Sequence, residues 1–217
     1  MAQPQRLHEG IFITFEGVDG AGKTTQIRAL GAWMRQRGAK VVETREPGGT
    51  PIAERIRDLV LDAENASLSS RAELFLLLAA RAEHVEQHVQ PALESGQVVL
   101  CDRFTDATLA YQGAGRSFPT DFLSKANAFA ANSLAPDLTI LLDVDPAIGR
   151  RRLAGRGTPV DRFEGEAAAF YDRVREGYLR IAKKDSGRVV LVDASGSMAV
   201  VQEKIRNEVT RRRFVGS

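Results

Sequence analysis

The chain has 217 residues, of which 43% are hydrophobic and 27% are charged, and its formal net charge is only +2. This length suits one α/β domain with a substantial core, and so small a charge does not favour a nucleic-acid-binding protein. No apolar run approaches the ~20 residues that span a bilayer, and the first ten residues lack a signal-peptide core. The single cysteine, Cys101, cannot form an internal disulfide. We therefore expect a cytoplasmic protein that binds neither nucleic acid nor membrane.

Short apolar runs alternate along the chain with longer stretches of helical periodicity. The runs predict five strands, at residues 10–16, 40–44, 97–101, 138–144 and 188–192. The periodic stretches predict seven helices, from the glycine loop to about 37, at 52–61, from 69 or 70 to 96, and at 121–132, 146–153, 166–184 and 197–213.

This alternation predicts a single α/β domain over residues 1–217, with a parallel sheet covered by helices on both faces. Ligands of such sheets collect beyond the carboxyl ends of the strands. The candidate residues at these ends are Gly17 onward, Arg45, Asp102 and Asp143.

A glycine-rich segment, FEGVDGAGKTT, follows the first predicted strand and matches the phosphate-loop pattern in full. Its glycines allow successive backbone N–H groups to turn onto phosphate oxygens, and Lys23 can reach the outer phosphates. A chance match is the alternative, but the strand before the loop and the helix after it argue against chance. The predicted ATP-binding residues are Gly17, Val18, Asp19, Gly20, Ala21, Gly22, Lys23, Thr24 and Thr25.

Thr24 and Asp102 are candidate Mg²⁺ ligands. The Thr24 hydroxyl belongs to the phosphate loop, and Asp102 ends an apolar strand, as the acidic partner of such loops does. The alternative for Asp102 is a helix cap or a surface turn. No Asn-Lys-x-Asp sequence indicates a GTPase, and the chain has no room for the extra domains of a motor ATPase. Of the classes of P-loop protein considered, a small-molecule kinase remains.

Six segments resemble those of bacterial thymidylate kinases, in matching order: FEGVDGAGKTT, TREPGGTP, LLAARAEHV, CDRFTDATLAYQGAGR, PDLTILLDVDP and GRGTPVDRFE. The resemblance implies a three-layer P-loop kinase fold with a five-stranded parallel sheet and a short arginine-rich lid at about 153–162. It also implies the substrates ATP and thymidine 5′-monophosphate (dTMP), with Mg²⁺ as cofactor. A homodimer through the helices at 69–95 and 121–132 is implied as well.

Charge in this site would come chiefly from arginines. An acceptor phosphate is already ionised at neutral pH, so the reaction needs positioning and neutralisation and no general base. By resemblance, Arg103 clamps the acceptor phosphate, Arg45 reaches it, and Glu46 and Pro47 form a wall of the acceptor pocket. The alternatives are a structural ion pair for Arg103 and an ordinary strand-end arginine at Arg45.

The resemblance also supplies the residues around the nucleoside. Arg81 would donate to a thymine carbonyl, Thr108 and Gln112 would meet the other base edge, and Asp19 would accept from the 3′-hydroxyl. Tyr111 would block a ribose 2′-hydroxyl. The alternatives are an exposed helix face for Arg81 and core packing for Tyr111. Leu77 stands where many relatives stack an aromatic ring on the base, so it can cover the base but cannot stack.

Transition-state charge is expected from the lid, because no arginine lies between Gly17 and Gly22. Arg156 is the first candidate and Arg152 the second, and Asp161 and Glu164 resemble lid-end acids that order the loop around substrate. Two other functions stay open. One is a deoxynucleoside kinase with Glu46 as its base, and the other is a regulatory protein that uses the loop as a switch.

Overall fold

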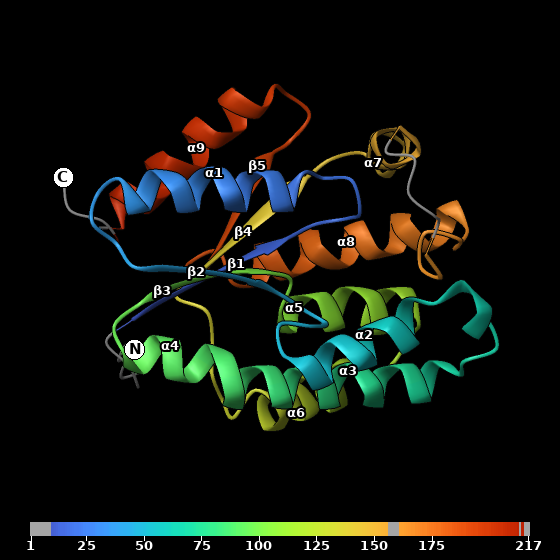
Figure 1. The fold of residues 1–217 in the computed structure, drawn as a ribbon. Coiled ribbons are helices and arrows are strands. Elements are labelled where there is room, and N and C mark those ends of the chain that lie inside the picture. The colour runs from blue at the N-terminus through green and yellow to red at the C-terminus, as the bar shows by residue number, and fades with distance from the viewer. Residues whose placement is uncertain (1–9, 156–160, 213, 215–217) are drawn as a thin grey trace.

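The computed structural model describes residues 10–155, 161–212 and 214. Five parallel strands form one sheet in the order β2 (Val41–Arg45), β3 (Val98–Asp102), β1 (Ile11–Glu16), β4 (Leu138–Asp143) and β5 (Val189–Asp193) (Figure 1). Each strand begins and ends within one residue of its predicted bounds. The predicted α/β fold with a five-stranded parallel sheet is confirmed.

The register aligns the carboxyl ends of the three strands that carry the candidate residues. Asp102 pairs with Phe15 on one side and with Arg45 on the other. The chain beyond β1, β2 and β3 therefore emerges at one edge of the sheet, where parallel α/β proteins bind ligands.

Helices cover both faces of this sheet. Figure 1 shows α1 (Lys23–Arg35) and α9 (Met198–Arg211) on one side, with α3 (Ser70–His84) and α6 (Thr120–Ala130) on the other. The remaining long helices are α2 (Pro51–Leu61), α7 (Pro146–Ala154) and α8 (Ala168–Lys184). Asp145 caps α7 by accepting from the Ala147 N–H at 2.7 Å, as its place before Pro146 predicts. No helix in the described ranges is long and apolar enough to cross a membrane.

The long helix predicted from residue 69 or 70 to 96 has a widened turn within it. α3 passes into a π-helical segment, Val85–Val89, and then into α4 (Gln90–Glu94). Pro91 accounts for the irregular turn, because proline has no N–H for the helical hydrogen bond and its ring crowds the preceding turn.

Among the described residues, one α-helix and one 3-10 helix, Ala63–Asn65, were not predicted from the sequence. Residues after β3 form α5 (Thr105–Thr108), which continues as a π-helical segment over Leu109–Gly115. The segment is short, ends in glycines and lacks a continuous apolar stripe, because several of its side chains face a pocket. Periodicity therefore gave no helical signal there.

Candidate active site

The phosphate loop joins β1 to α1 through three glycines with positive φ: Gly17 at +133°, Gly20 at +76° and Gly22 at +96°. This left-handed backbone is open to glycine and strained for other residues, so the loop depends on these positions. Lys23 is almost fully buried and folds back over the loop, donating to the carbonyls of Gly17 at 3.2 Å and Val18 at 3.1 Å. The ammonium group is thus held at the centre of the loop.

The two candidate Mg²⁺ ligands lie together. The Thr24 hydroxyl donates to Asp102 Oδ2 at 2.8 Å, between the start of α1 and the end of β3. Among the described residues, no cluster of three or more His, Cys, Asp or Glu side chains could hold a metal. This sparse donor set fits Mg²⁺, which keeps several waters and takes one or two protein ligands beside substrate phosphates.

Arg103 links the loop to the neighbouring pocket. It has a φ of +72°, which is uncommon for a residue other than glycine and is typical of functional sites. Its guanidinium donates to Gly17 O, to Asp19 Oδ1 at 2.6 Å, and to the hydroxyls of Tyr111 and Tyr178. Burial raises the pKa of Asp19, but Arg103 and Lys23 outweigh it and lower that pKa to about 2. The ion pair considered as an alternative role for Arg103 is therefore present, and it lies within the site.

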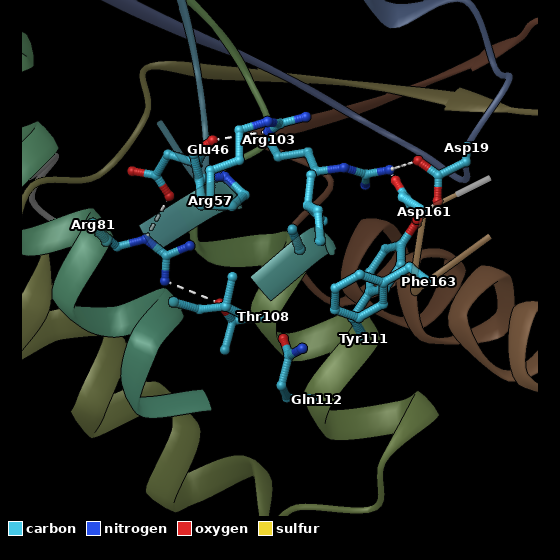
Figure 2. Close-up of a pocket in the computed structure, with 14 residues that line it drawn as sticks. Asp19, Glu46, Arg57, Arg81, Arg103, Thr108, Tyr111, Gln112, Asp161 and Phe163 are labelled. Atoms are coloured by element: carbon cyan, nitrogen blue, oxygen red, sulfur yellow. Dashed lines mark hydrogen bonds and ion pairs between the residues drawn. The ribbon is translucent and has the colours of Figure 1, made fainter. Parts of the chain in front are cut away.

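Arg81 is buried, so an exposed helix face is excluded for it. Nε donates to Glu46 Oε2 at 2.8 Å, Nη1 to Thr108 Oγ1 at 3.0 Å and to Asn127 Oδ1, and Nη2 to Phe104 O at 2.9 Å. Among the described residues, this bond to Phe104 is the hydrogen bond that Nη2 makes. Figure 2 shows the guanidinium between Glu46 and Thr108.

Arg81 belongs to a pocket with both polar and apolar walls, which encloses about 650 Å³ including space that is open to solvent. The predicted substrate residues that line it come from five segments and meet here (Figure 2): Asp19, Glu46, Pro47, Leu77, Arg81, Arg103, Thr108, Tyr111, Gln112 and Asp161. Leu77 is half-buried at the wall, whereas Phe75, on the same helix, is 57% exposed and outside the lining.

A second pocket opens on the phosphate loop. It is lined by Lys23, Thr24 and Asp102, by loop glycines, and by Arg45, Leu153 and Glu164. Five charged residues line both pockets: Asp19, Glu46, Arg57, Arg103 and Asp161. Groups bound in the two pockets would therefore approach each other across these side chains.

Some predicted residues take other positions. Val18 and Ala21 have buried side chains, and the exposed Thr25 side chain lines neither of these two pockets. Arg152 donates to Ala194 O at 3.1 Å and to Gly20 O at 3.4 Å, against the back of the loop. Arg156 lies outside the described residues.

Sequence reasoning missed Arg57 and Phe163. Arg57 lines both pockets and donates to Pro47 O at 2.8 Å, and burial together with nearby Arg45 lowers its pKa. Phe163 packs edge-on against Tyr111 with ring centroids 5.9 Å apart. A signal for Arg57 existed: it stands four residues from buried Ala53 and from Leu61, which lines the same pocket, and so shares their helix face.

A phosphate loop at the carboxyl edge of a parallel sheet, adjoining a charged second pocket, defines a P-loop kinase. A family model described as Thymidylate kinase matches residues 15–205. Thymidylate kinases of Pelobacter propionicus and Pseudomonas savastanoi pv. phaseolicola are 48% and 50% identical, covering 94% and 90% of this chain and 96% and 93% of theirs. The crystal structure of a thymidylate kinase from Ehrlichia chaffeensis matches with a TM-score of 0.77 at 33% identity, covering 92% of this chain and 98% of its own. The chain belongs to the thymidylate kinase family, whose enzymes use ATP to convert dTMP to dTDP.

Proposed function

We propose that this enzyme transfers the γ-phosphoryl group of ATP in line to dTMP, with ATP on the phosphate loop and dTMP in the pocket around Arg81. The observation that carries this proposal is the shared wall of the two pockets, in which Arg57 and Arg103 can face both phosphate groups. Positioning and neutralising two polyanions is the main task of a phosphoryl-transfer enzyme.

The base contacts follow from the hydrogen-bonding capacity of two side chains. In the described part of the chain Arg81 Nη2 makes one hydrogen bond, so its second N–H can be donated to a ligand. The Thr108 hydroxyl accepts from Arg81, so its own proton can also be donated. Both donors suit the carbonyl oxygens of thymine. Leu61 and Leu77 supply apolar surface for the faces of the base, so packing takes the place of ring stacking.

The phosphate of dTMP is assigned to the arginines at the shared wall. Arg57 and Arg103 line both pockets, and Arg45, at the end of β2, lines the second one and pairs with Glu54 at 2.8 Å. Guanidinium groups suit this task because their forked donors match phosphate oxygens. Mg²⁺, held by Thr24 and Asp102, would supply charge neutralisation for the ATP phosphates.

Closure of the site is assigned to a lid at about 153–162. Arg156 is our first candidate for transition-state charge and Arg152 the second, since the phosphate loop has no arginine between Gly17 and Gly22. Asp161 and Glu164 line the second pocket, and Asp161 Oδ1 accepts from the Glu164 N–H at 2.8 Å. A closed lid would exclude water, so that phosphate passes to dTMP rather than to solvent.

The deoxynucleoside kinase alternative requires Glu46 as a base. Arg81 donates to one Glu46 oxygen at 2.8 Å, and His84 Nδ1 lies 3.1 Å from the other. Burial raises the pKa of Glu46, but Arg81 and His84 outweigh it and hold that pKa below its usual value. A carboxylate so stabilised is a poor base, which disfavours a hydroxyl acceptor.

Rapid measurement of ADP release separates the three functions. We expect fast release with dTMP and slow background hydrolysis with thymidine or without an acceptor. Turnover on thymidine alone would favour the deoxynucleoside kinase, and slow hydrolysis unaffected by dTMP would favour the regulatory protein. Lys23→Ala serves as the inactive reference, because it removes the ammonium group inside the loop.

We further propose that the enzyme is a homodimer and that the chain forms one kinase domain. Strands from residue 11 to residue 193 share one sheet, which favours a single domain. Exposed phenylalanines of α3 and α6 favour an interface at the helices that the sequence indicated. A cytoplasmic location stays a prediction.

A further inference from the structure

Glu73 is a fully buried carboxylate in the first turn of α3, and it is not one of the residues that line the dTMP pocket. Oε1 accepts from Gln112 Nε2 at 2.8 Å. Oε2 accepts from Arg162 Nη2 at 2.6 Å and from Arg116 Nη2 at 3.1 Å. Gln112 does line the pocket, and Figure 2 shows its amide pointing into it. Glu73 therefore stands directly behind a base-reading side chain.

The Glu73 carboxylate fixes which end of the Gln112 amide meets the substrate. A carboxylate can only accept hydrogen bonds, so Gln112 must turn its NH₂ group toward Glu73. Arg116 and Arg162 form ion pairs with this carboxylate from the side of Oε2. The amide oxygen of Gln112 is then left for the pocket, and the pocket gains an acceptor beside the donors of Arg81 and Thr108.

We propose that Glu73 is a positioning residue that makes the site selective for bases with an N3–H, thymine over cytosine. This inference rests on the proposed function. Thymine offers a proton at N3, which the Gln112 oxygen accepts. Cytosine has a lone pair at N3, which would face that oxygen without a proton between them, so the same orientation also rejects the wrong base.

The arginines that pair with Glu73 are themselves held in place by other contacts. Arg162 also donates from Nε to Val60 O at 2.8 Å, and its backbone N–H donates to Leu61 O at 2.9 Å. Arg116 pairs with Glu166 at 2.6 Å as well. Arg162 is thus fixed to α2 and Arg116 to Glu166, so the carboxylate that they share has little freedom to follow a rotated Gln112.

The test compares kcat/KM for dTMP and for dCMP in the whole enzyme and in Glu73→Gln. A glutamine at 73 can donate as well as accept, so the Gln112 amide is free to present its NH₂ group. We expect the dTMP preference to fall by about tenfold or more, the equivalent of one hydrogen bond, through a higher KM for dTMP and a lower one for dCMP. KM for ATP should stay unchanged.

Glu166→Gln is the matched control. It removes the other carboxylate paired with Arg116 and leaves Gln112 untouched, so the dTMP preference should be retained. In a Gln112→Ala background, Glu73→Gln should cause no further loss of preference. If Glu73→Gln does not fold, Glu73→Asp is the second variant. Its shorter side chain retains the negative charge for the two arginines but moves the carboxylate away from Gln112, so we expect the same loss of dTMP preference.

Two results would overturn the inference. One is a folded Glu73→Gln or Glu73→Asp enzyme with the full dTMP preference, and the other is an equal loss with and without Gln112, which would mean general damage to packing. In both cases the wild-type enzyme still phosphorylates dTMP and the proposed function stands. A wild-type enzyme inactive on dTMP would overturn both.

Discussion

Arg57 is a cation at the wall of both pockets, and among the described residues its guanidinium donates to the Pro47 carbonyl. A guanidinium that is hydrogen-bonded to a neutral carbonyl and lines two pockets suits an anionic ligand. We predict that Arg57→Ala raises KM for dTMP by about 10- to 100-fold, the equivalent of one lost charge-assisted hydrogen bond. Steady-state kinetics with dTMP as the varied substrate, at saturating ATP, measure this KM.

Arg55→Ala is the control for this prediction. Arg55 lies on the same helix with an exposed side chain, so the variant removes a similar charge away from the pockets. An equal rise in KM for both variants would mean that net charge attracts the substrate, and would remove Arg57 from direct contact with dTMP.

Glu16 provides a pH-dependent contribution to stability. It is fully buried at the end of β1, where it accepts from the Tyr178 hydroxyl and from the Phe104 N–H. Burial, with the nearby Asp106 charge, raises its pKa from 4.5 to about 7. A carboxyl group whose pKa is higher in the folded state stabilises the protein below the unfolded value, and this contribution is lost as pH rises through 7.

We therefore predict that the unfolding free energy of the wild type, relative to Glu16→Gln, falls by a few kcal/mol between pH 4.5 and pH 8. Urea unfolding at intervals across this range measures the difference. Glu203→Gln, at an exposed position of α9, should give a curve parallel to the wild type. A parallel curve for Glu16→Gln would contradict the prediction.

At the scale of elements, α7 packs directly against the phosphate loop. A Cβ added to Gly149 would overlap the Asp19 carbonyl, and one added to Gly20 would overlap the Gly149 backbone. These backbone atoms cannot rotate away as a side chain could. We predict that Gly149→Ala displaces the loop, raises KM for ATP and destabilises the protein by about 1–3 kcal/mol.

Gly187→Ala is the comparison for that variant. A Cβ at Gly187 would meet nothing within 4 Å, so its stability and kinetics should match the wild type. Thermal unfolding and ATP titrations measure both variants. Normal ATP kinetics in Gly149→Ala would show that the loop tolerates a shift of α7.

The strands could be predicted closely from the sequence, and the segment at 105–115 could not. Strands buried on both faces are continuous apolar runs, and this pattern is local in the chain. The helical character of α5 and the segment after it depends on α8, against which that segment packs, and on the pocket that it lines. Such contacts leave no periodic pattern.

At the scale of the whole molecule, three phenylalanines are left exposed on α3 and α6. Phe129 is 92% exposed, Phe75 57% and Phe122 47%. These helices pack against each other on one side of the sheet (Figure 1). A group of exposed aromatic side chains of this kind is typical of a protein interface, and the occupant that we propose is a second copy of the chain.

We predict that Phe129→Asp yields monomers, because it would bury a charge in the proposed interface. Analytical ultracentrifugation measures the mass, with Val200→Asp as the control, since Val200 is also exposed but lies on α9 across the sheet. A wild-type monomer, or a dimer that survives Phe129→Asp, would contradict this interface.

The sequence by itself determined the strands and the phosphate loop, because both are short, local patterns. It also predicted, by resemblance to a family, the substrate residues from Arg45 to Gln112. Only the tertiary structure decided how these residues act on one another. Glu73 stands 39 positions before Gln112 and Asp19 stands 84 positions before Arg103, yet each pair forms a hydrogen bond. Such partners are set by how helices pack over the sheet, and packing is a property of the folded chain that no local pattern encodes.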